Sequence, residues 1–137
     1  MIPQDEEALL IRSRALCEAM EDEDDWLKRE VLAHAGNRWS FGVIHVLKEG
    51  GRLRHAEIRR RLEGVTQRML TRTLRQLERD GLILRHDFEE VSPRVEYELT
   101  PLGEAFLLRI IPMWLWIFEH AEDFRQARES HFRSSSE

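Results

Sequence analysis

The chain has 137 residues, a length typical of one domain, and 42% of them are hydrophobic, which is enough for a core. Its most apolar stretch, residues 106–118, is interrupted by Arg109 and Pro112 and is expected to be too short to span a membrane. The acidic N-terminus is unlike the basic start of a secretory signal. The single cysteine, Cys17, excludes an intrachain disulfide. We therefore expect a soluble, cytoplasmic protein.

The net charge of −5 conceals a separation of charge along the chain. Residues 1–30 hold ten acidic and four basic side chains, a net of −6. Residues 52–86 hold ten arginines and four acidic side chains, a net of +6. A polyanion would therefore meet a positive field in the middle of this molecule.

Hydrophobic spacing predicts three helices in the first part of the chain. The first covers residues 5–21. An acidic run at 21–25 then precedes a second helix over 26–35, whose N-terminal dipole favours negative charge. Gly36 ends the second helix, and a third covers about 38–48 before Gly50 and Gly51.

A short helix and a longer helix are expected next, joined by a turn at Gly64. The short helix covers residues 55–62 and follows an extended piece at 52–53. The longer helix begins at the N-cap Thr66 and runs to about Arg79. Its inward face is predicted to consist of Met69, Leu70, Thr73, Leu74 and Leu77.

Alternating apolar and polar residues at 82–88 and 94–99 predict a β-hairpin. Thr100 and Pro101 then start a last helix, to about residue 127, with an unusually apolar face. The serine-rich tail, 128–137, is expected to be disordered. The fold class is therefore mainly α with a small β-hairpin. One winged helix-turn-helix domain is expected over 1–127, with terminal dimerisation helices at 5–35 and 100–127 and a DNA-binding core at 38–99.

This order of elements is typical of a winged helix-turn-helix, which places its second helix in the DNA major groove. If the leucines of the longer helix face the core, its opposite side carries polar residues suited to DNA. Arginine can donate two hydrogen bonds to guanine, glutamine can bind adenine, and threonine can contact phosphate or the thymine methyl. We interpret this side as groove-reading rather than merely solvated; its residues are Gln67, Arg68, Thr71, Arg72 and Arg75.

Further DNA contacts are expected around this helix and from the hairpin, which would be the wing. The acidic tip, Glu89 and Glu90, argues against deep insertion of the wing into a groove. His86 either approaches phosphate or simply completes the small sheet. The residues expected at or near the DNA backbone are Arg52, Arg54, Thr66, Arg85 and Arg94.

Five segments resemble the HxlR-type regulators, a winged-helix branch related to the MarR group; they are residues 36–39, 54–58, 64–71, 74–83 and 93–103. The resemblance implies a homodimer with terminal helices packed between subunits, and two recognition helices on a pseudo-palindromic operator. Two positions depart from the family pattern. Trp26 stands where many members carry a sensing cysteine, so a thiol switch is not carried over, and His55 replaces a phenylalanine.

Other site types find little support in the sequence. Cys17 is expected to be a buried residue of the dimer interface, with a symmetric intersubunit disulfide as the alternative. The six histidines lack the spacing of a metal site, and no metal or cofactor is expected. No phosphate loop, nucleophile elbow or pair of catalytic carboxylates is present, so we do not expect an enzyme.

Four aromatic residues have two interpretations. They either fill the dimer core, which an apolar stripe at helical spacing favours, or line a pocket for a small aromatic or electrophilic effector; they are Trp26, Trp39, Trp114 and Phe118.

We predict a sequence-specific transcriptional regulator that binds duplex DNA as a homodimer. The alternative function is a winged-helix module for protein–protein contact in a larger assembly, with the acidic N-terminal third docking a basic partner. Salt discriminates the two, because counterion release weakens DNA binding steeply as salt rises.

Overall fold

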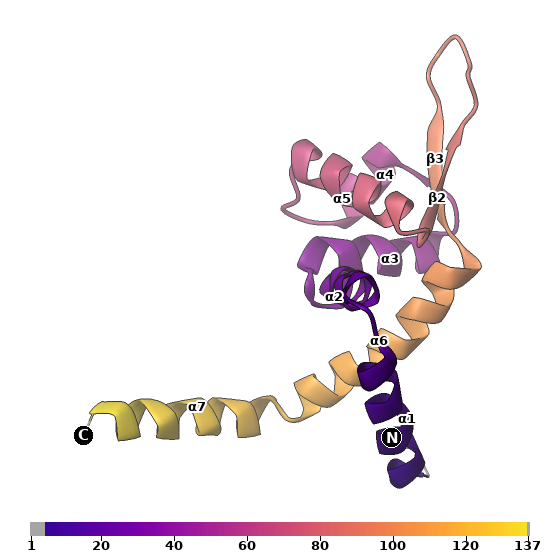
Figure 1. Ribbon diagram of the computed structural model, residues 1–137. Helices are drawn as coiled ribbons and strands as arrows, with labels where there is room; N and C mark the ends of the chain where they lie inside the picture. The colour runs from indigo at the N-terminus through magenta and orange to yellow at the C-terminus, as the bar shows by residue number, and fades with distance from the viewer. Residues whose placement is uncertain (1–4, 137) are drawn as a thin grey trace.

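The computed structural model describes residues 5–136, which form seven helices and three short strands (Figure 1). The mainly helical fold class with a small sheet is confirmed. In chain order the elements are α1 Glu6–Ala19, α2 Asp22–Gly36, α3 Arg38–Gly50, β1 Leu53–Arg54, α4 His55–Arg61, α5 Gln67–Arg79, β2 Ile83–Asp87, β3 Val95–Leu99, α6 Pro101–Glu119 and α7 Ala121–Ser136.

The sheet has three antiparallel strands in the order β1-β3-β2, so the expected two-stranded hairpin gains a third strand. β1 pairs with β3 through Leu53 opposite Tyr97 and Arg54 opposite Glu96. Two residues are too few to show the alternation that identifies a strand, which is why the sequence predicted only an extended piece there. The β2–β3 hairpin projects away from the helices beside α4 and α5 (Figure 1).

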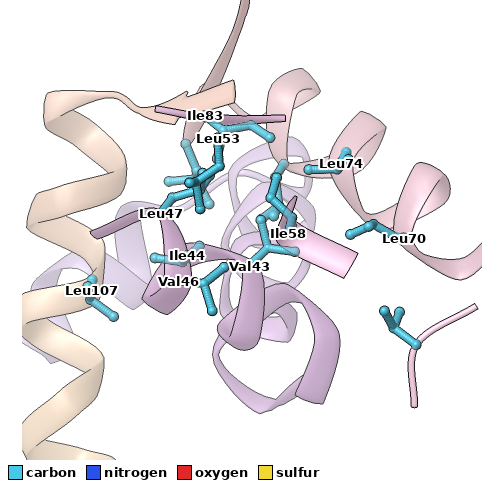
Figure 2. Close-up of a cluster of buried hydrophobic side chains, with 13 residues drawn as sticks. Val43, Ile44, Val46, Leu47, Leu53, Ile58, Leu70, Leu74, Ile83 and Leu107 are labelled. Carbon is cyan, nitrogen blue, oxygen red and sulfur yellow. The ribbon is translucent and has the colours of Figure 1, made fainter. Parts of the chain in front are cut away.

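The core lies where α3, α4, α5, the sheet and the start of α6 meet (Figure 2). Of the predicted inward face of α5, Leu70, Thr73, Leu74 and Leu77 are buried, as expected. Met69 was also predicted to face inward, and this prediction was wrong, because its side chain is exposed. It lies beside α2 and α3, at the rim of a cavity, rather than over the core.

The first half of α6 is packed against the body, and its second half is exposed apart from the stacking of Trp114 on Phe41 of α3. Thr100 Oγ1 accepts a hydrogen bond from Gly103 N at 3.0 Å, which starts the helix as the sequence predicted. Leu107 and Ile110 are buried, whereas every residue from Pro112 to Glu119 is exposed. The helix and α7 extend from the body as an arm (Figure 1).

Among residues 5–136, one helix is long and apolar enough to cross a membrane by length and composition. It is α6, with a mean hydropathy of 1.4 over 18 residues, of which 17% are buried. This helix is longer than the apolar stretch 106–118, because Arg109 and Pro112 do not interrupt it. A helix that packs its apolar face against another protein surface has the same composition.

Two expectations for the C-terminal part of the chain were wrong. The last helix, expected as one element over 100–127, is divided at His120 into α6 and α7, and the tail expected to be disordered belongs to α7. The segment contains no glycine or proline, and Glu122–Arg125 and Glu129–Arg133 form ion pairs at helical spacing, which favours a helix. The final serines donate hydrogen bonds to carbonyls four residues earlier. Residues 1–4 of the predicted domain and Glu137 of the predicted tail lie outside the described residues.

Candidate nucleic-acid interface

The turn between α4 and α5 is fixed by local chemistry. Gly64 has a φ of +91°, a backbone conformation that favours glycine. Val65 is buried and anchors the turn to the core. Thr66 Oγ1 then accepts a hydrogen bond from Met69 N at 3.1 Å, which caps the first turn of α5. The long helix therefore begins at Gln67, directly after the turn.

The side of α5 that faces away from the core holds the predicted groove-reading residues. Gln67, Arg68, Arg72 and Arg75 are exposed, Thr71 is half-buried, and all five line one shallow depression together with Gln76. In the described part of the chain, none of the three arginines forms an ion pair or a side-chain hydrogen bond. Their donors are therefore available to an external acceptor.

His55 contacts this surface from α4. Its Nε2 lies 3.2 Å from Thr71 Oγ1, so the histidine holds the threonine side chain of α5. Burial lowers the pKa of His55, and the nearby Arg59 guanidinium lowers it further. The ring is therefore neutral at neutral pH, which suits a hydrogen bond to a hydroxyl. The sequence identified His55 only as a departure from the family pattern.

Two arginines on α4 belong to the same surface but were not selected from the sequence. Arg59 and Arg60 are exposed and line a second depression with His55, Gly64 and Gln67, next to the turn. The sequence feature that could have identified them is the run of three arginines at 59–61, which ends a helix beside the turn. A seven-residue helix is too short for periodicity to show which of the three faces outward.

Three of the arginines expected at the DNA backbone, Arg52 and the wing residues Arg85 and Arg94, are paired within the protein. Arg52 Nη2 lies 3.2 Å from Glu98 Oε1, and Arg85 Nη2 lies 3.5 Å from Asp87 Oδ2. Arg94 Nη2 lies 3.2 Å from Glu90 Oε1. Of the four basic residues predicted outside α5, Arg54 differs: its side chain is exposed and its backbone N–H donates to Glu57 Oε1 at 3.1 Å.

The two wing strands are tied together by a polar pair. His86 Nε2 lies 2.7 Å from Glu98 Oε1. The hydrogen bond from His86, and then the charge of Arg52, lower the pKa of Glu98. The Arg94 guanidinium stacks over the Phe88 ring, 4.0 Å from its centre. His86 therefore contacts a neighbouring strand of the sheet, while its approach to phosphate stays a prediction.

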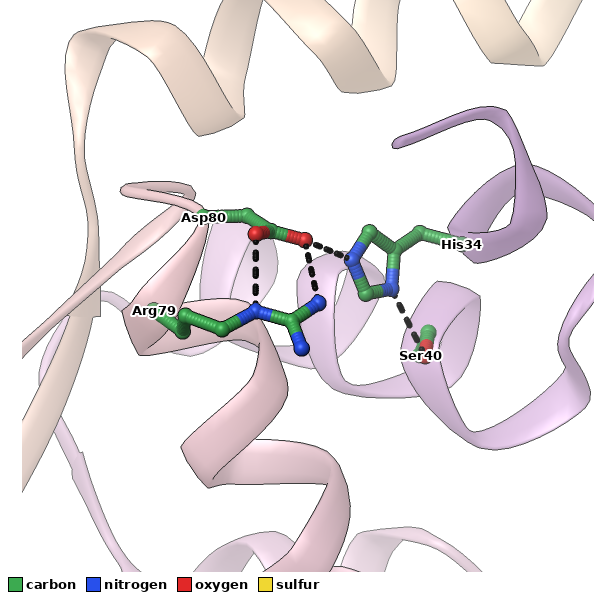
Figure 3. Close-up of polar contacts among 4 residues, drawn as sticks. All are labelled: His34, Ser40, Arg79 and Asp80. Atoms are coloured by element: carbon green, nitrogen blue, oxygen red, sulfur yellow. Dashed lines mark hydrogen bonds and ion pairs between the residues drawn. The ribbon is translucent and has the colours of Figure 1, made fainter. Parts of the chain in front are cut away.

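A buried polar cluster lies at the end of α5 and joins it to α2 (Figure 3). His34 Nε2 lies 2.6 Å from Asp80 Oδ2, and His34 Nδ1 lies 3.3 Å from Ser40 Oγ. Arg79 donates to both carboxylate oxygens, at 3.0 and 3.1 Å. These donors lower the pKa of Asp80, the Arg79 hydrogen bond most. The sequence assigned no role to His34 or Asp80.

The four aromatic residues expected to form a dimer core or an effector pocket do not meet in the structure. Trp39 lines a cavity of about 440 Å³ between α2, α3 and α5. Trp114 and Phe118 stack on one another and line a separate groove between α6 and α7. Trp26 is 64% exposed on α2. In the single chain these residues therefore line separate surfaces, and a shared dimer core or an effector pocket stays a prediction.

Cys17 is exposed on α1 in the single chain, and its burial in a dimer interface stays a prediction. All of α1 lacks buried residues, because the helix does not pack into the core. Across residues 5–136, no group of three or more histidine, cysteine or acidic side chains is placed to hold a metal ion.

A family model described as HxlR-like helix-turn-helix matches residues 34–124. The chain is 40% identical over 89 residues to the uncharacterized HTH-type transcriptional regulator YtfH of Escherichia coli (strain K12), covering 65% of this chain and 70% of that protein.

Two solved structures share the fold. The putative transcriptional regulator ytfH from Salmonella typhimurium has a TM-score of 0.62 and 36% identity, covering 74% of this chain and 90% of that one. A putative MarR-family transcriptional regulator from Enterococcus faecalis V583 has a TM-score of 0.59 and 33% identity, covering 81% and 94%.

Proposed function

Because the chain belongs to the HxlR-like helix-turn-helix family, a family of DNA-binding transcriptional regulators, we propose that it binds a specific operator in duplex DNA as a homodimer. The observation that carries this proposal is the outward side of α5. There Arg68, Arg72 and Arg75 are exposed and have no acidic partner among residues 5–136. A helix with such a side, directly after a capped turn, suits the major groove.

Each part of the surface has a proposed task. Arg68 and Arg72 donate to base edges, with Gln67 and Thr71 beside them, and Arg75 contacts a phosphate. Arg59 and Arg60 of α4 bind the DNA backbone next to the turn, with Arg54 and Thr66. Arg52, Arg85 and Arg94 contribute less, because each must exchange the carboxylate with which it is paired for a phosphate.

The proposed dimer uses the apolar surfaces that the single chain leaves uncovered. Trp114 and Phe118 on α6, and Leu10 and Leu16 on α1, are half or more exposed. Contiguous apolar surface of this kind marks an interface. A dimer would cover it and present two copies of α5 to successive turns of DNA. We accordingly assign the apolar composition of α6 to dimerisation and place this non-enzymatic regulator in the cytoplasm.

A small effector has two candidate positions. An aromatic effector would enter the cavity beside Trp39, which shares Arg72 and Gln76 with the outward side of α5. An electrophile would react at the exposed thiol of Cys17. Either ligand is proposed on position alone.

The test is binding to DNA fragments from around the protein's own gene, at two salt concentrations, with random DNA as competitor. Specific binding resists the competitor and weakens as salt rises. Arg68→Ala or Arg72→Ala should lose about 1–3 kcal/mol of operator affinity if the arginine contacts a base. Arg133→Ala, on the exposed end of α7, removes the same charge as a control.

Three outcomes would contradict the proposal. An equal loss on operator and random DNA would reassign the substituted arginine to phosphate. Competition by random DNA would leave only a nonspecific DNA binder. An absence of DNA binding at low salt would favour the alternative, a winged helix that contacts another protein.

A further inference from the structure

The recognition helix α5 and the N-terminal helix α2 are separated by a cavity and joined at one end only. Glu30 and His34 of α2 line this cavity of about 440 Å³ from one side, and Arg72, Gln76 and Arg79 line it from the other. Within residues 5–136, the only hydrogen bond between α2 and α5 or its C-cap is the one from His34 to Asp80. This bond therefore bridges a gap that side chains do not fill.

The bridge is buried and its atoms are fully engaged. His34 is 5% exposed, and both of its ring nitrogens have partners. Because the Asp80 carboxylate is ionised, His34 Nε2 carries a proton and donates to Oδ2. Arg79 also donates to both carboxylate oxygens, which favours the orientation of Asp80 toward the histidine. Breaking a buried charge-assisted hydrogen bond is costly, so the two helices keep their relation at this point.

The bond between His34 and Asp80 lies between the proposed DNA-binding surface on α5 and the proposed dimer contact on α1. Asp80 is the C-cap of α5, whose other end carries Gln67 and Arg68. His34 lies near the end of α2, which follows α1 and so leads to the proposed dimer contact. A pivot at Asp80 would swing the far end of α5 relative to α2. In a symmetric dimer, that swing would change the distance between the two recognition helices.

We propose that His34 and Asp80 are a positioning pair, which fixes the tilt of α5 against α2 and thereby the half-site spacing that the dimer accepts. This inference rests on the proposed function. It assigns a specificity to residues that contact no DNA, through the geometry in which they hold the recognition helix.

The test compares operators whose half-sites are separated by the natural spacing or by one or two base pairs more or fewer. His34→Phe fills similar space without the hydrogen bond. We expect wild-type protein to prefer one spacing, and His34→Phe to reduce that preference by about tenfold. Affinity for an isolated half-site and its salt dependence should stay unchanged. His34→Gln, whose amide nitrogen takes the place of Nε2, should restore the preference.

The ratio of affinities for two spacings distinguishes a change in the position of α5 from a loss of protein stability. A ratio of affinities for two spacings, measured on one preparation, does not depend on the fraction of folded protein. Lys28→Ala, which removes an exposed ion pair on the same helix, should leave the ratio unchanged. Asp80→Asn, tested in parallel, should also reduce the preference, and it provides the answer if His34→Phe does not fold.

An unchanged spacing ratio in the folded His34 or Asp80 variant would overturn the inference. A wild-type protein that accepts all spacings equally would do the same. Wild-type protein that binds no operator specifically would instead overturn the proposed function, so the two failures are distinguishable.

Discussion

Arginine residues that look equivalent in the sequence differ in what neutralises them. The sequence counts ten arginines between residues 52 and 86 and predicts DNA contacts from several of them. In the structure, those on the outward side of α5 have no acidic partner among residues 5–136, whereas Arg52 and Arg85 face carboxylates. Glu98, the partner of Arg52, lies 46 residues away in the sequence, so no local pattern could predict this ion pair.

This difference predicts unequal salt effects. Arg75→Ala should weaken DNA binding and reduce the slope of log affinity against log salt by about one, because one phosphate contact is lost. Arg85→Ala, which removes the same charge, should change the slope less, since Asp87 already neutralises that arginine. Fluorescence anisotropy over a series of salt concentrations measures both slopes. Equal changes in slope would contradict the assignment.

His55 predicts a dependence of stability on pH. Its pKa is lowered in the folded chain by burial and by Arg59, so the unfolded state binds the proton more readily. The stabilisation is therefore complete above the ordinary histidine pKa of about 6.5 and is lost as the pH falls through the folded value. Urea unfolding between about pH 7 and about pH 5 should show this loss in wild-type protein. His55→Phe should reduce it, and an unchanged profile would refute the role.

At the scale of elements, the sequence predicts most boundaries because capping residues mark them. Thr66 and Thr100 start their helices through the hydrogen bonds that such caps make. Two of the differences between prediction and structure have clear physical causes. β1 has two residues and is a strand only because β3 lies beside it. α7 has weak hydrophobic patterning, and its helical propensity outweighs the serines that suggested disorder.

Gly103 joins two elements too closely for any side chain. A Cβ there would lie 2.0 Å from the Leu82 carbonyl oxygen, a backbone atom that cannot move aside. Gly103→Ala should therefore destabilise the fold by at least about 1–3 kcal/mol, as overpacking does. Gly36→Ala is the matched control, because a Cβ at that helix end meets nothing within 4 Å. Thermal unfolding compares the two variants, and equal stability would contradict the close packing of α6 on β2.

At the scale of the whole molecule, the sequence predicts which helix carries the proposed recognition surface but not the contacts that orient this helix. α5 was identified from its leucines, its cap and its arginines, all of which are local features. The bond between His34 and Asp80 joins residues 46 apart, and the exposure of Cys17 depends on whether anything covers α1. Such features follow from how the elements pack, which periodicity does not report.

The uncovered apolar surface of α6 makes the proposed dimer testable. Phe118 is 70% exposed in the single chain, so a charge there is free to remain in water and should not unfold the domain. In a dimer the same charge would be buried without a partner, which is strongly unfavourable. Phe118→Glu should therefore raise the dimer dissociation constant by at least about tenfold.

Sedimentation velocity over a range of concentrations measures that dissociation. Val91→Glu is the matched control, because it places the same charge at an exposed apolar residue on the wing. Loss of the dimer should also lower operator affinity, since each monomer contacts one half-site, while half-site affinity stays constant. A Phe118→Glu protein that dimerises like the wild type would show that subunits meet elsewhere, and a wild-type protein that is monomeric at all concentrations would show that they do not meet. In either case the apolar composition of α6 would need another explanation.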